Sequence, residues 1–136
     1  MKSFPYLLPR RFRPAPRLFA GLVLALSVQW ALAQAPLSMD ATLKAMLDAM
    51  QSGSLANFVA AGDASFKSTM TTEMLAGVSA QIGPRLSQGY TVTFLATLNQ
   101  QGYTVYLYKL VFKDGKDDRL VTMAVKDGKV AGFFLR

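Results

Sequence analysis

The fold is decided by the stretch YTVTFLATLNQQGYTVYLYKLVFKDGKDDRLVTMAVKDGKVAGFFL, which occupies residues 90–135. It opens with alternating apolar and polar residues, the pattern of a half-buried strand. Residues 99–102 and the pairs Asp114-Gly115 and Asp127-Gly128 have the composition of tight turns between antiparallel strands. Three turns that join four strands predict an antiparallel meander over residues 90–98, 103–113, 120–126 and 129–135. The alternation puts five residues on one face of the first strand: Tyr90, Val92, Phe94, Ala96 and Leu98.

The residues before this stretch have the period of helices. Apolar side chains recur at i, i+3, i+4 and i+7 from Leu43, which predicts a helix that ends at Gly53. A short second helix is expected over residues 55–59. A third is expected to start near Thr72 and to stop at the pair Gly83-Pro84. Helices followed by strands define an α+β fold, in which short N-terminal helices pack on a four-stranded antiparallel meander sheet.

Residues 1–33 have the organisation of an export signal. Five of the 15 basic residues and none of the 8 acidic residues precede residue 34, and the basic stretch runs into LFAGLVLALSVQWALA at residues 18–33. The small residues Ala31 and Ala33 predict cleavage between Ala33 and Gln34, a flexible mature N-terminus over 34–37 and a single domain over 38–136. At about 1.5 Å per residue the apolar run reaches about 24 Å, short of a hydrocarbon core of about 30 Å, so a retained anchor is the less favoured alternative. We therefore expect a periplasmic or secreted protein.

The composition excludes several kinds of chemistry. The chain has no cysteine and no histidine, so it has no disulfide, thiolate nucleophile, Ser-His-Asp triad or imidazole metal site. Residues 34–136 hold 10 basic and 8 acidic residues, a net charge of only +2, which argues against nucleic-acid binding. Asp114, Asp117 and Asp118 lack the spacing and the closing glutamate of an EF-hand calcium loop. No metal and no cofactor is expected.

Several segments carry a resemblance to a known family. They are LANFVAAGD at 55–63, the helix from Thr72, GYTVY at 102–106 and the ending VTMAVKDGKVAGFF at 121–134. Together they resemble a small secreted bacterial domain family of unknown function, whose members are similar to short versions of the nuclear transport factor two-like (cystatin-like) cone. This resemblance implies a cone-like fold, in which helices lie in the concavity of a curved antiparallel sheet.

The same resemblance implies a pocket between helices and sheet. Ketosteroid-isomerase-like cones pair an acidic base with a tyrosine or a protonated acid there. By that analogy the ligand-binding candidates are Asp63, Glu73, Tyr90, Tyr106 and Tyr108. The acids also have structural explanations, because Asp63 lies in a turn, where carboxylates bond backbone amides, and Glu73 lies near a helix start. We therefore assign no catalytic residue.

The strand over 103–113 is apolar on both faces, which suggests that something covers its outer side. If Tyr106, Tyr108 and Phe112 face outward, two copies of the chain are expected to form a homodimer, sheet against sheet. In the opposite phase Lys109 and Lys113 face outward and the tyrosines lie inside, which removes the case for that dimer.

These observations favour an exported, non-enzymatic binding or interaction module. It would hold a small apolar ligand or an envelope protein between helices and sheet, with no nucleic acid, and would touch the membrane only through an uncleaved leader. The alternatives are a small cone-type enzyme that uses an Asp or Glu with a sheet tyrosine, and a structural dimerisation domain.

Overall fold

A computed structural model describes residues 37–136, which form one α+β domain. The predicted leader, the cleavage site between Ala33 and Gln34 and residues 34–36 lie outside the described residues. Leu37, which we assigned to the flexible N-terminus, already belongs to the first helix. The helices are α1 (Leu37–Ser52), α2 (Leu55–Phe58), α3 (Ala64–Thr69) and α4 (Thr72–Ser87). No helix in this part of the chain is long and apolar enough to cross a membrane.

Side-chain caps begin the three later helices. Asp63 accepts a hydrogen bond of 2.7 Å from the backbone N–H of Phe66, at the start of α3. Ser54 and Thr71 do the same for α2 and α4. Each cap satisfies a backbone donor that the first turn of a helix leaves without a partner. The structure therefore has a helix, α3, in a segment for which the sequence predicted none.

The prediction that the last helix stops at Gly83-Pro84 is wrong, because α4 continues through both residues to Ser87. A Cβ atom at Gly83 would lie 3.8 Å from the carbonyl oxygens of Met50 and Gln51 in α1. Gly83 thus lies where two helices approach closely, and it does not end the helix. Pro84 lacks one intrahelical donor, but packing against α1 offsets that loss.

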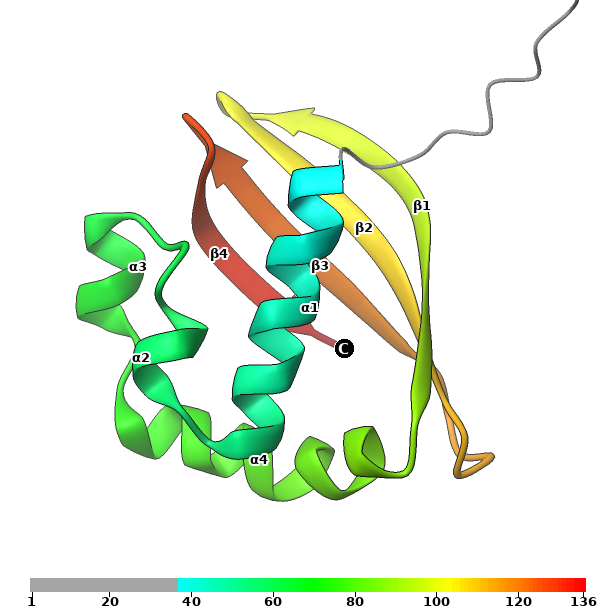
Figure 1. Cartoon of the computed structure of the whole chain (residues 1–136). Coiled ribbons are helices and arrows are strands. Elements are labelled where there is room, and N and C mark those ends of the chain that lie inside the picture. Colours follow the sequence, from blue (N-terminus) through cyan, green and yellow to red (C-terminus); the bar gives the residue numbers. More distant parts are fainter. Residues whose placement is uncertain (1–36) are drawn as a thin grey trace, which may run out of the picture. The chain divides into compact units, whose positions relative to one another are not determined.

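The sheet is the predicted meander, with strand order β1-β2-β3-β4 and every pair antiparallel. Its strands are β1 (Tyr90–Gln100), β2 (Tyr103–Phe112), β3 (Arg119–Lys126) and β4 (Lys129–Leu135). Two hairpins have two-residue turns with positive φ at both positions, at Gln101-Gly102 and Asp127-Gly128, as the turns that match strand twist require. All four helices lie on one side of the curved sheet, with α1 along its concave face (Figure 1).

A bulge in β1 breaks the alternation that the sequence predicted. Phe94 pairs with Tyr108, but the next pair is Ala96 with Leu107, so Leu95 is an extra residue. A bulge shifts every later side chain to the opposite face. Ala96 and Leu98 therefore lie on the outer face of the sheet, and not beside Phe94.

The faces of β2 settle the choice that the sequence left open. Tyr108 and Phe112 are 1% and 3% exposed and belong to the hydrophobic core under the helices, and Tyr106 is half-buried against that core. The outer face carries Val105, Leu107 and the exposed Lys109. The outward placement of Tyr106, Tyr108 and Phe112, on which the expected sheet-to-sheet dimer depends, is therefore wrong, because these side chains lie in or against the core under the helices.

An ion pair joins α4 to the loop between β2 and β3. The Arg85 guanidinium donates hydrogen bonds of 2.6 and 3.2 Å to the Asp114 carboxylate and one of 2.9 Å to the Asp117 carbonyl oxygen. Its central carbon lies 3.8 Å from the centre of the Phe112 ring. The hydrogen bonds from Arg85 and from the Lys116 backbone hold the pKa of Asp114 below its usual value. Asp114, one of the three loop carboxylates considered as calcium ligands, is therefore held in this ion pair.

We expect Asp114→Asn to flatten the acid dependence of stability. Because the folded-state pKa of Asp114 is lowered, the charged carboxylate stabilises the fold above the unfolded pKa of about 4 and loses that contribution as pH falls through the folded value. The variant should be less stable than wild type at pH 7, with the difference shrinking below about pH 4. Urea unfolding between pH 7 and 2.5 measures it. Asp118→Asn is the control, since Asp118 forms only an exposed pair with Lys109. A constant difference down to the lowest pH would contradict the assignment.

Candidate functional site

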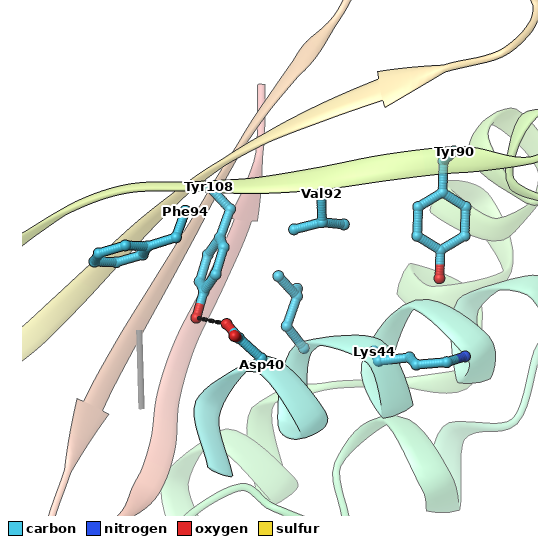
Figure 2. Close-up of a pocket in the computed structure, with 7 residues that line it drawn as sticks. Asp40, Lys44, Tyr90, Val92, Phe94 and Tyr108 are labelled. Carbon is cyan, nitrogen blue, oxygen red and sulfur yellow. Dashed lines mark hydrogen bonds between the residues drawn. The ribbon is translucent and has the colours of Figure 1, made fainter. Parts of the chain in front are cut away.

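A pocket of about 410 Å³ lies between α1 and β1, on the concave side of the sheet (Figure 2). Its volume is in the range of pockets that hold small molecules. It is lined by Asp40, Leu43, Lys44, Tyr90, Val92, Phe94 and Tyr108.

The two periodicities of the chain explain why these residues meet. Positions 40, 43 and 44 lie on one face of α1, because residues three and four apart are neighbours on a helix. Tyr90, Val92 and Phe94 are alternate residues of β1, so they share the face that looks toward α1. Tyr108 joins them from β2, where it pairs with Phe94. The bulge at Leu95 ends this row, so the pocket ends there as well.

A hydrogen bond between Asp40 and Tyr108 links α1 to β2 within the lining of the pocket. The Tyr108 hydroxyl donates to Oδ1 of Asp40 over 3.1 Å (Figure 2). The tyrosine is buried and Asp40 is exposed. Burial, and then the bond to Asp40, raise the pKa of Tyr108 far above its ordinary value, so the hydroxyl remains a donor at neutral pH. Phe94 packs edge-on against the Tyr108 ring, with ring centres 5.5 Å apart, which holds that ring in place.

The opposite end of the pocket carries Tyr90 and Lys44. The Lys44 ammonium donates to the Asp48 carboxylate at 2.9 Å, one turn along α1. Burial, and then the negative charge of Asp48, raise the pKa of Tyr90. The raised pKa keeps the Tyr90 hydroxyl neutral, and Figure 2 shows this hydroxyl pointing toward α1. It is therefore a neutral hydrogen-bonding group at this end of the pocket.

The predicted site residues divide into two groups. Tyr90 and Tyr108 line the pocket, whereas Tyr106 packs against the core beside it. Asp63 caps α3 and Glu73 lies exposed in the first turn of α4, so neither acid meets a sheet tyrosine.

The acid that does meet a sheet tyrosine is Asp40, which lies in the first turn of α1 and is not among the predicted site residues. Its i, i+4 spacing from Lys44 placed both side chains on one helix face, but their nearness to β1 depends on tertiary packing. Within residues 37–136 no cluster of three or more metal-ligating side chains occurs.

The comparisons with known proteins give one weak structural likeness. An uncharacterized cystatin fold protein from Novosphingobium aromaticivorans, known from its crystal structure, is similar with a TM-score of 0.38 and 14% identity, over 71% of this chain and 95% of that chain. No family model matches this chain, and the search of curated proteins found no match. The α+β class therefore rests on the chain's own helices and meander sheet, and the family that the sequence suggested stays a resemblance.

Proposed function

We propose that this chain is an exported, non-enzymatic binding module that holds a small amphipathic molecule in the pocket between α1 and β1. The observation that carries the proposal is a pocket that combines apolar lining from Leu43, Val92 and Phe94 with the hydrogen-bonded pair Asp40–Tyr108. A wall of this kind binds an apolar group by removing it from water, and a few polar groups fix its orientation. The leader pattern in residues 1–33 supports the export part of this proposal.

The exposed carboxylate of Asp40 favours a ligand whose polar head group donates hydrogen bonds. Asp40 uses Oδ1 to accept from Tyr108 and forms no ion pair within the described part of the chain. Its second oxygen is an acceptor at the exposed end of the pocket. The nearby Lys44 is already paired with Asp48. An amine on a short apolar chain or ring would therefore be preferred over a carboxylate of the same shape.

The enzyme alternative would use the same Asp40–Tyr108 pair. One feature favours binding instead. Asp40 is exposed, whereas a carboxylate whose pKa is tuned for acid–base catalysis is usually shielded from water. The raised pKa values of Tyr108 and Tyr90 keep both hydroxyls neutral, which suits ligand binding and an oxyanion hole equally.

Calorimetric titration with octylamine and octanoate tests the proposal on the full chain. We expect saturable binding of octylamine, at least about tenfold tighter than binding of octanoate, which corresponds to about 1.4 kcal/mol. Asp40→Asn should remove most of this preference. Glu73→Gln is the matched control, because Glu73 is also an exposed carboxylate in the first turn of a helix, does not line the pocket and pairs with no pocket residue among the described residues.

Phe94→Ala separates the apolar wall from the charge. It should weaken both probes by a similar factor, because it removes wall area without changing any charged group. Octylamine binding that is unchanged in both Asp40→Asn and Phe94→Ala would place the ligand elsewhere, and no saturable heat with either probe would reject an amphipathic ligand.

A further inference from the structure

The outer edge of β4 presents backbone groups that no neighbouring strand uses. Leu120 and Arg136 exchange two hydrogen bonds, of 2.8 and 3.0 Å. In an antiparallel ladder such pairs alternate with pairs that do not bond each other. The N–H and C=O groups of Leu135, and of Phe133 two residues earlier, therefore point away from β3. Within residues 37–136 no other backbone group bonds to them.

The chain itself shows that this edge accepts a strand. Near the start of β4, Val130 donates to the Ala61 carbonyl oxygen and accepts from the Asp63 N–H, each at 2.9 Å. This short parallel bridge ends where Asp63 caps α3 and the chain turns away. Beyond this bridge, no other segment of the described residues pairs with the outer edge of β4.

An apolar groove runs beside the open part of the edge. It consists of two adjoining hollows of about 350 and 210 Å³ that share Met70, Met74, Phe133 and Phe134. Met74, Val78 and Phe134 are 49%, 39% and 53% exposed, although large apolar side chains are usually covered. The two methionines are flexible enough to adapt to a bound side chain.

Arg119 lies in the same groove, and its Nε atom has no hydrogen-bond partner among residues 37–136. It lines the larger hollow together with Leu135 and Gln81. The Nε atom is buried, and a buried donor without an acceptor is costly. No acidic side chain lines either hollow, so a carboxylate would have to come from a bound partner.

We propose that the open edge of β4 and this groove bind an extended peptide segment of a partner protein, which adds a fifth strand to the sheet and offers a carboxylate to Arg119. The backbone groups of Phe133 and Leu135 require an extended partner, since only a strand presents donors and acceptors at their spacing. The groove takes the side chains that project to one side, which are every second residue of such a strand. Affinity comes from the main chain and selectivity from the groove and Arg119.

A second copy of this chain is a poorer occupant. Two β4 edges side by side would bring together strands that carry Lys129 and Arg136 and would supply no carboxylate to Arg119. Like charges across an interface are unfavourable, and the buried donor would stay without a partner. The complementary partner is therefore apolar and acidic.

Nuclear magnetic resonance of the full chain, labelled with nitrogen-15, tests the proposal. The probe is the acetylated and amidated peptide Val-Thr-Val-Thr-Val-Glu. We expect saturable shifts at β4 and slower hydrogen exchange of the Phe133 and Leu135 amides, because these become ladder donors. The same peptide with glutamine in place of glutamate should bind about three- to tenfold more weakly to wild type. With Arg119→Gln the two peptides should bind equally.

Leu135→Pro removes one outward donor without removing a bond to β3, and it should weaken binding at least about tenfold. Thr97→Pro is the control on the opposite edge. Thr97 lies three residues before Gln100, which pairs with Tyr103 across a two-residue turn, so its N–H also points outward.

Four results would overturn the proposal: shifts confined to another surface, no binding at millimolar peptide, equal weakening by both prolines, or protection of Phe133 and Leu135 that rises with protein concentration alone. The last would assign the edge to a second copy of the chain.

Discussion

Leu110→Lys is expected to leave the domain unfolded. Leu110 is 0% exposed and lies on the covered face of β2, where it pairs with Val92 on one side and Arg119 on the other. A lysine there would bury an ammonium group beside an existing guanidinium, with no acid opposite it. The cost of an unpaired buried charge is several kcal/mol, comparable with the whole stability of a small domain, about 5–15 kcal/mol.

The neighbouring outer-face position supplies the control. Val111→Lys changes the next residue along β2, on the half-buried outer face that already carries Lys109. Its long side chain can cover apolar surface and still reach water, so the variant should fold with a loss of about 1 kcal/mol. Far-ultraviolet circular dichroism and urea unfolding measure both variants. A folded Leu110→Lys, or an unfolded Val111→Lys, would mean that the faces of β2 are assigned the wrong way round.

Tyr108→Lys would be a weaker test of the same faces. Tyr108 is as deeply buried as Leu110, but its hydroxyl already reaches the exposed carboxylate of Asp40. A lysine at that position could extend along the same path and form an ion pair with Asp40. The variant could then fold even though residue 108 lies on the covered face, so a folded variant would not identify the face.

The strands were predictable because local chemistry decides them. The turn pairs Gln101-Gly102 and Asp127-Gly128 adopt positive φ, which glycine tolerates at no steric cost, so both hairpins were predictable. The first turn is shorter than the predicted one over 99–102, because β1 continues to Gln100. The faces of β2 could not, because both of its rows are apolar. The lysines at 109 and 113 indicated correctly which face of β2 is exposed, but the assignment depends on the packing of α1 against the other face.

The bulge and the continued helix depend on contacts outside the local sequence. Nothing in the run TFLAT marks Leu95 as the extra residue, since Leu95 and Ala96 both suit a strand. Gly83-Pro84 has the composition of a helix stop, but in the structure Gly83 is buried against α1 and α4 continues past it.

The candidate site was predictable only in part for the same reason. The tyrosines Tyr90 and Tyr108 were chosen because they lie in strands. Asp40, the acidic partner of Tyr108, is 68 positions away from it in the sequence, and a single sequence carries no signal for that pairing. Glu73 lies in the first turn of a helix, the structural explanation that the sequence offered for it. Asp63, for which the sequence suggested a turn, is the N-cap of α3.

The short helices α2 and α3 are held by an aromatic cluster around Phe58. Helices of four and six residues are too short to be stable alone. Phe58 is 3% exposed, with its ring centre 5.9 Å from that of Phe66 in α3 and 5.5 Å from that of Phe133 in β4. This one side chain therefore ties both short helices to the edge strand.

Phe58→Ala is expected to lower the free energy of unfolding by about 3–5 kcal/mol, the usual cost of deleting a buried ring. Phe134→Ala is the control, because Phe134 is 53% exposed and should cost below about 1 kcal/mol. Urea unfolding gives both values. Hydrogen exchange adds a local readout, since amides of α3 should lose protection in Phe58→Ala before those of β2 do. Equal losses in the two variants would mean that Phe58 does not anchor α2 and α3, and that the caps at Ser54 and Asp63 hold these helices without it.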